Sequence, residues 1–176
     1  MLLSFEEQKH PLENKWSFWL YTNKHKNWEE NLEELTTFKT VEDYWCLYHH
    51  MKLPSELPLG QDYAIFKNGI RPMWEDEANK KGGRWQIMFD ELKYGVMDTI
   101  WLDSVLLLIG ENFKYSDNIC GVVVNVRPKS KISIWTSTGN NSPAIMEIGR
   151  KLKRHLRIPN RMHYYLHTTS KSLYNI

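Results

Sequence analysis

The chain has 176 residues, of which 41% are hydrophobic and 25% charged, and these values fit one globular domain with its own core. Its formal net charge of +2 is too small for a protein that coats nucleic acid, but it is compatible with one short anionic ligand. No apolar run approaches the ~20 residues of a transmembrane helix, and the N-terminus turns acidic too soon for a secretory signal. We therefore expect one monomeric domain over residues 1–176, with residues 1–9 and the last few residues mobile. We expect it to be located in the cytoplasm, or in the nucleus as well, without membrane contact.

The first part of the chain predicts a strand and a helix on either side of an ambiguous segment. Residues 15–22 are rich in aromatic side chains with partial alternation, which is typical of a strand. Residues 30–38 favour a helix by their Glu and Leu but a strand by the run Leu-Thr-Thr-Phe, and local propensity leaves both open. Thr40 and Asp43 resemble an acidic capping box, and they open a helix that Pro54 ends. Its apolar face consists of residues at helical spacing, namely Val41, Trp45, Tyr48 and Met51.

The middle of the chain predicts a long loop between two strands. Residues 63–67 form the first strand, which an Asn-Gly turn pair closes. Residues 68–83 are polar and contain Pro72, and a segment of this length and composition is typical of an ordered, functional loop. The second strand covers residues 84–89.

The second half of the chain predicts two more helices and several strands. Asp98 is the expected N-cap of a helix that ends at Gly110, and Ser142 with Pro143 is expected to open the next helix. Further strands are expected at 120–126, at 132–136 and, as one or two edge strands, in the tail 161–176. Because several connections are short and hairpin-like, the pattern favours an α+β fold with an antiparallel sheet covered on one face by three helices.

Two indoles and a carboxylate stand in loops rather than in strands or helices. Trp28 follows a polar stretch, and Trp74 with Glu75 lies in the long loop of the middle segment. An indole face attracts a cation that lies over it, and a carboxylate suits a ligand edge with two neighbouring donors. The three side chains therefore indicate a sandwich for a flat, cationic, alkylated guanine, unless the two indoles plug the open end of the sheet.

Basic side chains gather in a turn between two predicted strands. Arg127, Lys129 and Lys131 occupy this turn, where they are able to converge on a phosphate chain together with Arg84. Taken alone, the same turn also fits a solvated hairpin tip. Residues 150–157 form a basic helix face that fits a role in solubility.

A third group of apolar residues lies on the first two helices. Trp101 and Leu102 are adjacent, so one narrow helix face does not bury both. With Val41 and Trp45 they form either a groove for a partner helix or a part of the core.

Signatures of catalysis and of metal binding are weak. The chain has no P-loop, no GxGxxG or GxSxG motif and no zinc-type array of Cys and His. His163 and His167 have i, i+4 spacing, but their segment is expected to be a strand, in which this spacing is too wide for shared ligation. The acidic run that begins at Glu75 has no second acidic cluster to support a metal-dependent hydrolase. We expect no enzyme activity, no metal and no cofactor.

Six segments together resemble the eukaryotic translation initiation factor 4E family, whose members bind the 5′ cap of messenger RNA. The resemblance covers residues 10–158. The matching segments are His10-Pro-Leu12, Thr40-Val-Glu-Asp-Tyr-Trp45, Gly69-Ile-Arg-Pro-Met-Trp-Glu-Asp-Glu77, Gly82-Gly-Arg-Trp85, Leu108-Ile-Gly-Glu111 and Cys120-Gly-Val-Val-Val-Asn-Val-Arg127.

The resemblance implies a fold and a ligand site. It implies a single curved sheet of eight mainly antiparallel strands with three helices on the convex face, and it makes residues 30–38 a strand. It also implies that Trp28 and Trp74 sandwich 7-methylguanine while Glu75 accepts hydrogen bonds from the guanine N1 and N2. The remaining implied contacts are Trp135 near the N7 methyl group and Arg84, Arg127, Lys129 and Lys131 around the triphosphate.

The resemblance further implies a protein-binding surface on the convex face, for the helical Tyr-x-x-x-x-Leu-Φ motif of factor 4G and of 4E-binding proteins. Its residues match His10, Pro11, Leu12, Val41, Trp45, Leu102 and Asp103. The implied function is cap binding with recruitment of the initiation scaffold. Two alternatives stay open, a cap-binding repressor with weakened scaffold binding and a decapping hydrolase.

The chain departs from the family pattern at three places. Residues 90–96 stand where the family usually has a basic loop near the cap, and Asp103 stands where Glu is usual. The tail after Pro159 is shorter than usual. The presence of Trp at both sandwich positions fits the initiation-type branch of the family.

Overall fold

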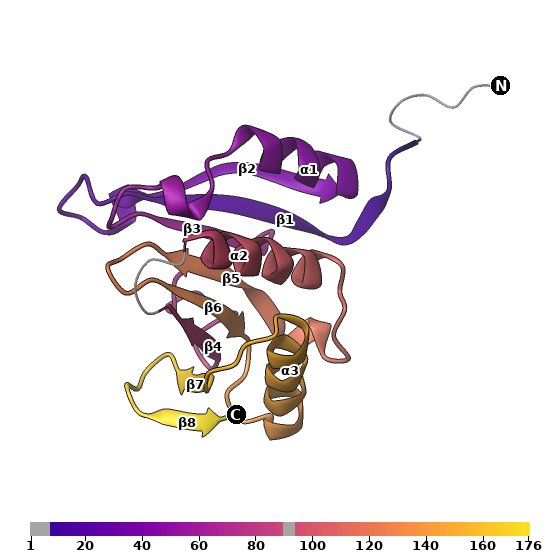
Figure 1. Cartoon of the computed structure of the whole chain (residues 1–176), viewed down its shortest axis with the longest axis vertical. Helices are drawn as coiled ribbons and strands as arrows, with labels where there is room; N and C mark the ends of the chain where they lie inside the picture. The colour runs from indigo at the N-terminus through magenta and orange to yellow at the C-terminus, as the bar shows by residue number, and fades with distance from the viewer. Residues whose placement is uncertain (1–7, 90–93) are drawn as a thin grey trace.

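The computed structural model describes residues 8–89 and 94–176, which form one curved antiparallel sheet with helices on one face (Figure 1). The strands are β1 (Pro11–Tyr21), β2 (Leu32–Thr40), β3 (Asp62–Lys67), β4 (Gly83–Met88), β5 (Ile119–Asn125), β6 (Lys131–Thr136), β7 (His163–Leu166) and β8 (Ser172–Asn175). The α-helices are α1 (Val41–His50), α2 (Tyr94–Ile109) and α3 (Ser142–His155). The strand order is β2-β1-β3-β5-β6-β4-β7-β8, and the expected α+β fold is confirmed.

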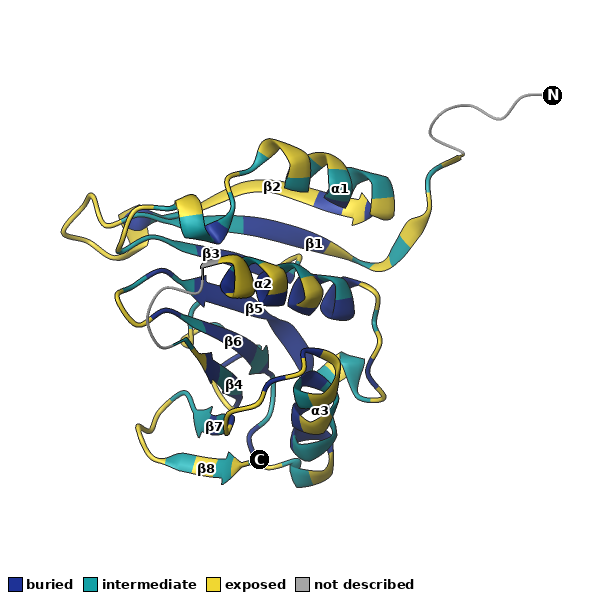
Figure 2. Ribbon diagram, in the orientation of Figure 1, coloured by how far each residue is buried: buried dark blue, intermediate teal, exposed yellow. Residues whose placement is uncertain are grey.

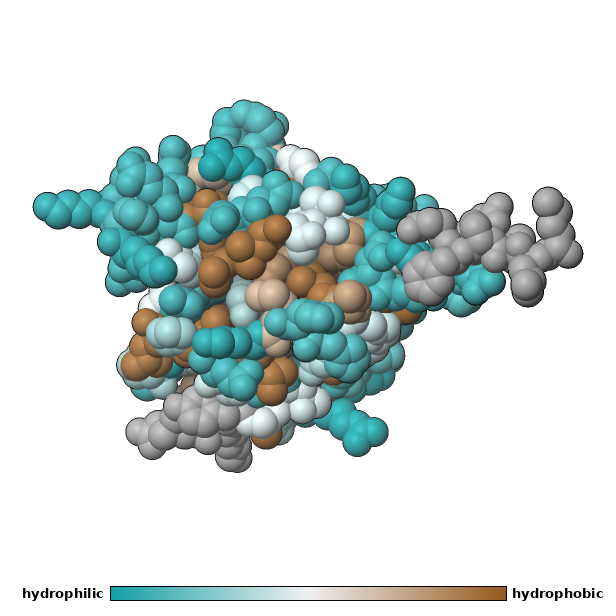
Figure 3. Space-filling view, turned by 90° about the horizontal axis from the view of Figure 1, so that it is seen from above, coloured by the Kyte–Doolittle hydropathy of each residue, from teal (hydrophilic) through white to brown (hydrophobic). Residues whose placement is uncertain are grey.

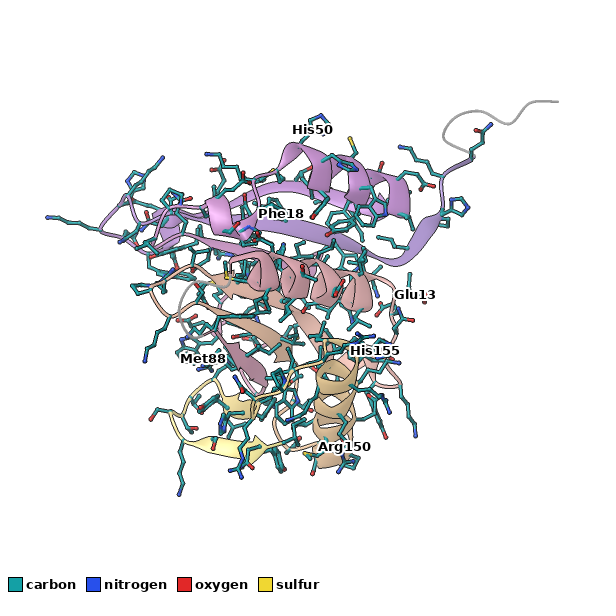
Figure 4. The ribbon with its side chains drawn as sticks, in the orientation of Figure 1. Glu13, Phe18, His50, Met88, Arg150 and His155 are labelled. Carbon is teal, nitrogen blue, oxygen red and sulfur yellow. The ribbon has the colours of Figure 1, made fainter. Side chains whose placement is uncertain are left out.

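Strand alternation assigns the side chains of the sheet to two faces. Tyr63 and Ile65 of β3 belong to the large core between the sheet and the helices, whereas Ala64 and Phe66 belong to a small cluster on the opposite face. Phe18 likewise points from β1 towards the helical layer (Figure 4). Buried residues concentrate in the central strands, whereas the edge strand β2 is mostly exposed and the edge strand β8 is a mixture of intermediate and exposed residues (Figure 2). The face opposite the helices thus carries a smaller apolar cluster of its own, separate from the large core.

The segment 30–38, which local propensity left open, forms the 3-10 turn Glu29–Asn31 and strand β2. The strand predicted from the family resemblance is thus confirmed. β2 pairs with β1 along the edge of the sheet, and most of its residues are exposed. Pairing with β1 overrides the helical propensity of Glu33 and Glu34, because a strand here satisfies the backbone groups of both segments.

Of the three helix N-caps expected from the sequence, one is confirmed and two are wrong. Thr40 caps α1 by accepting a hydrogen bond from the backbone N–H of Asp43, as expected. The expected N-cap at Asp98 is wrong, because α2 already begins at Tyr94 and the Asp98 carboxylate accepts from the N–H (2.9 Å) and Oγ (2.5 Å) of Ser55. In α3 the N-cap is Asn141 rather than Ser142, since the Asn141 side-chain oxygen accepts a hydrogen bond from the backbone N–H of Ala144, the third residue of the helix.

The C-terminal end of the chain is paired with the rest of the sheet. Residues 1–7 lie outside the described residues, as do residues 90–93 of the segment 90–96 that departs from the family pattern. The last residues, expected to be mobile, are paired: β8 lies against β7, and Ile176 exchanges two backbone hydrogen bonds with Met162 at 3.0 and 3.1 Å. No helix in the described part of the chain is long and apolar enough to span a membrane.

Candidate functional site

A cavity of about 550 Å³ opens on the face of the sheet opposite the helices. Its floor consists of Ala64, Val123 and Ser133, which the strand register places side by side on β3, β5 and β6. All side chains predicted for the ligand line this cavity except Lys129, which is exposed outside it. Those that line it are Trp28, Trp74, Glu75, Arg84, Arg127, Lys131 and Trp135.

Trp28 stands in a loop that a buried asparagine holds together. Asn31 is only 3% exposed, and its side-chain oxygen accepts from the N–H of Lys24 (3.0 Å) and of His25 (2.7 Å). Its side-chain nitrogen donates to the carbonyl oxygens of His25 (2.8 Å) and Asn27 (3.3 Å). One carboxamide thus satisfies four backbone groups of the turn that carries the indole, which fixes that turn without regular structure.

Trp74 and Glu75 stand in a loop with a similar brace. Asn79 is fully buried and donates to the carbonyl oxygens of Arg71 (3.0 Å) and Met73 (2.9 Å). The Asp76 carboxylate accepts from the N–H of Arg71 (3.1 Å) and of Ala78 (3.0 Å). The backbone on both sides of Trp74 is therefore tied down, and the loop predicted from the polar segment 68–83 is ordered.

Both indoles are exposed at the mouth of the cavity. Trp28 is 42% exposed and Trp74 is 47% exposed, so neither plugs the end of the sheet. The Tyr21 ring lies 5.9 Å from the Trp28 ring, centroid to centroid, and supports it from the cavity wall. Two large apolar rings held at an open mouth by polar braces fit a flat ligand better than a structural role.

The other end of the cavity is cationic. Arg127 forms an ion pair with Asp62 (2.7 Å), so its guanidinium is fixed in place rather than free at a hairpin tip. Burial raises the pKa of Asp62 even though Arg127 stabilises the charged form. Burial and the neighbouring Arg84 and Arg127 lower the pKa of Lys131, and burial also lowers the pKa of Arg84. Like charges held this close in a partly buried site favour an anionic ligand between them.

Two further residues that line the cavity, Asp62 and His167, were not predicted for the ligand from the sequence. Asp62 begins β3 and fixes Arg127, and His167 follows β7 and lies 4.2 Å from Trp135, ring centroid to ring centroid. Burial, with a smaller contribution from Arg84, lowers the pKa of His167 to about 4, so this imidazole is neutral at pH 7. Only the register that pairs β4 with β7 brings His167 to the cavity, and this register has no local pattern in the sequence.

The residues predicted for a partner helix lie on and beside the helical face. His10 contacts α1, since its ring Nδ1 lies 2.6 Å from Glu42 and its carbonyl oxygen accepts from the N–H of Val41 (2.9 Å). Val41 is 38% exposed, and apolar surface is open on the end of the molecule that carries α1 and β2 (Figure 3). Trp101, in contrast, is buried in the core at 4% exposure, so the core interpretation holds for this ring. The other predicted residues are partly or fully exposed, namely Pro11, Leu12, Trp45, Leu102 and Asp103.

A metal centre has no support within the described ranges. In residues 8–89 and 94–176, no three His, Cys, Asp or Glu side chains are placed to hold a metal ion. Cys46 and Cys120 are both free thiols, the first exposed and the second buried. Burial raises the pKa of Cys120 to about 12, which keeps this thiol protonated at neutral pH.

Comparison with known proteins places the chain in one family. The profile of the family described as "Eukaryotic initiation factor 4E" matches residues 11–175. Eukaryotic translation initiation factor 4E1 of Drosophila melanogaster is 54% identical over 163 residues, which cover 90% of this chain and 63% of the relative. The chain thus spans less than two thirds of the length of that relative.

Solved structures of similar proteins carry ligands and partners. Initiation factor 4E-3 of Caenorhabditis elegans, in complex with the 4E-binding protein Mextli, superposes with a TM-score of 0.92 at 39% identity, over 96% of this chain and 100% of that one. Initiation factor 4E-3 of Ascaris suum, in complex with the m7G cap, gives a TM-score of 0.92 at 41% identity, over 96% of this chain and 98% of that one. The matching family and the Drosophila melanogaster relative are both named as initiation factors.

Proposed function

Since the chain belongs to the eukaryotic initiation factor 4E family, we propose that it binds the 7-methylguanosine 5′ cap of messenger RNA in the cavity described above. Trp28 and Trp74 stack on the two faces of the methylated base. Glu75 accepts hydrogen bonds from the guanine N1 and N2, and Trp135 lies beside the N7 methyl group. The single observation that carries the proposal is one cavity with two braced, exposed indoles at its mouth and a cationic wall at its other end.

The energetics follow from the positive charge of the methylated base. Stacking on an aromatic side chain contributes ~1–3 kcal/mol per base. A cation over a desolvated ring contributes about 2 kcal/mol more, which a neutral guanine lacks. The site therefore selects for methylation through charge as well as through shape.

The cationic wall receives the phosphates in this arrangement. Arg127 and Lys131 contact the triphosphate, with Arg84 beside them, while Lys129 stands outside the cavity and acts through its charge alone. Asp62 holds the Arg127 guanidinium in a fixed orientation through the 2.7 Å ion pair. A guanidinium that is oriented before the ligand arrives loses less entropy on binding.

Titration of the intrinsic tryptophan fluorescence tests the proposal. The dissociation constant for 7-methyl-GTP is expected to be about thirtyfold lower than that for GTP, which corresponds to the cation–π contribution of about 2 kcal/mol. Equal quenching by the two nucleotides at equal concentrations would rule out cap recognition.

We propose in addition that the helical face recruits the initiation scaffold, factor 4G, and binds 4E-binding proteins. The surface consists of His10, Pro11, Leu12, Val41, Trp45, Leu102 and Asp103, and it takes the Tyr-x-x-x-x-Leu-Φ helix of the partner. The complex of the Caenorhabditis elegans relative with Mextli supports this assignment. The protein then acts as a cytoplasmic monomer that links capped RNA to the scaffold.

Two alternatives are separated from this function by simple assays. A repressor with weakened scaffold binding is not favoured, because the relatives are named as initiation factors. A dissociation constant above the micromolar range for a factor 4G motif peptide would instead favour the repressor. For a decapping hydrolase, release of methylated nucleotide from capped RNA in the presence of divalent metal is the diagnostic result, and we expect none.

A further inference from the structure

Charge is unevenly distributed along the sequence. Residues 148–176 hold seven of the 23 Lys and Arg side chains of the chain and none of its 21 Asp and Glu side chains. The formal net charge of +2 therefore combines an acidic larger part with a basic C-terminal part. An asymmetry of this kind indicates a local site for a polyanion, even where the net charge of the whole chain is small.

Four exposed arginines follow one another along α3 and the turn after it, namely Arg150, Arg154, Arg157 and Arg161. We call them the arginine row. Their spacings of four, three and four residues are typical of side chains that stand next to one another on a helix, at about 5–6 Å. The helix ends at His155, and Lys153 holds the following turn against it by donating to the carbonyl oxygen of Asn160 (3.2 Å). The row therefore gathers on the part of the surface that Arg150 and His155 mark in Figure 4.

The arginine row is unpaired and is carried by a firmly packed helix. Within residues 8–89 and 94–176, none of the four guanidinium groups forms a hydrogen bond or an ion pair. The inner side of α3 is tied to the sheet, because the Trp85 indole N–H donates to the carbonyl oxygen of Ile145 (2.8 Å). A Cβ added at Gly149 would lie only 2.4 Å from the Trp85 ring. Because α3 packs this closely, the row stays directed to solvent, on the helical face and away from the cavity.

The backbone at Arg157 adds a second observation. Arg157 has a φ of 52°, in the left-handed region, directly after Leu156, the C-cap of α3. Glycine is the usual residue at this place, because a Cβ costs free energy in this conformation. A charge that served solubility alone would stand without this strain at the exposed Asn160. The cation at Arg157 thus indicates that its place in the row matters.

The composition of this surface selects the class of polyanion. Among the residues that the structure describes, no large apolar side chain of α3 or of the turn 156–161 is exposed. Protein partners are usually anchored by aromatic or aliphatic side chains, and single-stranded RNA by rings on which its bases stack. A duplex presents regularly spaced phosphates and hides its bases, so cations alone suffice to hold it. Arginine suits this ligand, because its planar guanidinium contacts two phosphate oxygens at once.

We propose that the arginine row binds the phosphate backbone of an RNA duplex, at a site that is separate from the cavity. The proposal goes beyond cap binding and depends on it only for the kind of nucleic acid, since capped messenger RNA is the polyanion that cap binding brings to this protein. Contacts with phosphates carry no sequence information, so the row accepts any base-paired stem. Cap and stem bind on opposite faces and therefore at the same time.

The test uses the full chain and a labelled, uncapped RNA hairpin with a stem of about 16 base pairs, a length that spans several turns of backbone contacts. Saturating 7-methyl-GTP keeps the cavity occupied, and fluorescence anisotropy measures binding of the hairpin across a range of salt concentrations. The double variant Arg150→Gln, Arg154→Gln is expected to bind the hairpin roughly fivefold or more weakly at low salt, because two exposed charge contacts are lost. Its affinity is also expected to depend less on salt.

A matched control and a second variant separate loss of contacts from loss of structure. Lys39→Gln with Lys52→Gln removes the same charge from exposed sites near α1 and is expected to bind the hairpin as the wild type does. Arg157→Gly removes one charge and relieves the left-handed strain, so it is expected to weaken hairpin binding while raising the unfolding temperature. A weaker hairpin complex in a more stable protein is not explained by misfolding.

Three results would overturn the proposal. The first is wild-type hairpin affinity in the double arginine variant, and the second is an equal loss in the lysine control. The third is displacement of the hairpin by polyglutamate at equal charge concentration, which would assign the row to an acidic protein segment. A wild type that binds the hairpin but not 7-methyl-GTP would leave the arginine row in place and refute the proposed cap binding alone.

Discussion

The side-chain amide of Asn79 donates a hydrogen bond to the carbonyl oxygen of Met73 at 2.9 Å, directly before the backbone of Trp74. Asn79 is fully buried, so this bond and its second one, to Arg71, form away from water. The indole that closes one side of the cavity thus depends on a side chain that never reaches the ligand. Asn31 has the same relation to Trp28, from the other loop.

Asn79→Ala is expected to weaken binding of 7-methyl-GTP by roughly fivefold or more, because each lost hydrogen bond contributes about 1 kcal/mol and the loop no longer holds one conformation. Binding of a factor 4G motif peptide on the helical face is expected to stay the same. Fluorescence titration of both ligands measures this, with the exposed Asn112→Ala as the control. Equal losses for both ligands would indicate global destabilisation and not a loop effect.

Trp74→Ala removes one face of the stack and is expected to raise the free energy of cap binding by ~1–3 kcal/mol. Because Trp74 is 47% exposed, the fold itself is expected to keep its unfolding temperature within a few degrees of the wild type. Isothermal titration with 7-methyl-GTP, with Leu59→Ala at an exposed site as the control, gives the comparison. Wild-type affinity in Trp74→Ala would place the ligand elsewhere.

Glu75→Gln is expected to weaken cap binding by about 1.5–3 kcal/mol, the contribution of hydrogen bonds to a charged acceptor. Glu77, in the same loop, offers the matched control, since its carboxylate pairs with Lys80 and is 88% exposed. Glu77→Gln should therefore bind 7-methyl-GTP as the wild type does. Similar losses in both variants would mean that the charge of the loop, and not a contact with the guanine edge, drives binding.

Arg127→Ala is expected to reduce the salt dependence of cap binding, because one charged contact with the phosphates is lost and salt has less attraction left to screen. Arg150→Ala is the control, since Arg150 is exposed on α3, on the helical face (Figure 4). Affinities of 7-methyl-GTP across a range of salt concentrations provide the slopes. An unchanged slope in Arg127→Ala would contradict the phosphate assignment.

His167 predicts a pH dependence of stability. Its pKa is about 4 in the folded protein and about 6.5 in an unfolded chain, so below pH 6.5 the unfolded chain binds a proton that the folded chain does not. Stability is therefore fully present above pH 6.5 and falls as the pH drops towards 4, by roughly 3 kcal/mol at most. Urea unfolding at several pH values should show a shallower fall for His167→Gln than for the wild type. Parallel curves would show that His167 does not cause the loss.

The sequence revealed the site more completely than it revealed the elements around it. Trp28, Trp74 and Glu75 were visible because large rings and a carboxylate stand in polar loops, outside the strand and helix patterns. The residues that complete the wall were hidden for a physical reason. Asp62 and His167 stand at strand ends, and only long-range pairing brings them to the cavity. The cap expected at Asp98 failed in the same way, because a distant partner, Ser55, takes that carboxylate.

The strand order has a consequence for how the protein is made. β4, which carries Arg84, lies between β6 and β7, and both of these neighbours are synthesised after it. While the ribosome is still translating, β4 therefore has no partner in the sheet until most of the chain has emerged. The pocket is complete only when residue 167 has joined it. Chains that end before residue 167 are therefore expected to be retained less well on a cap resin than the full chain.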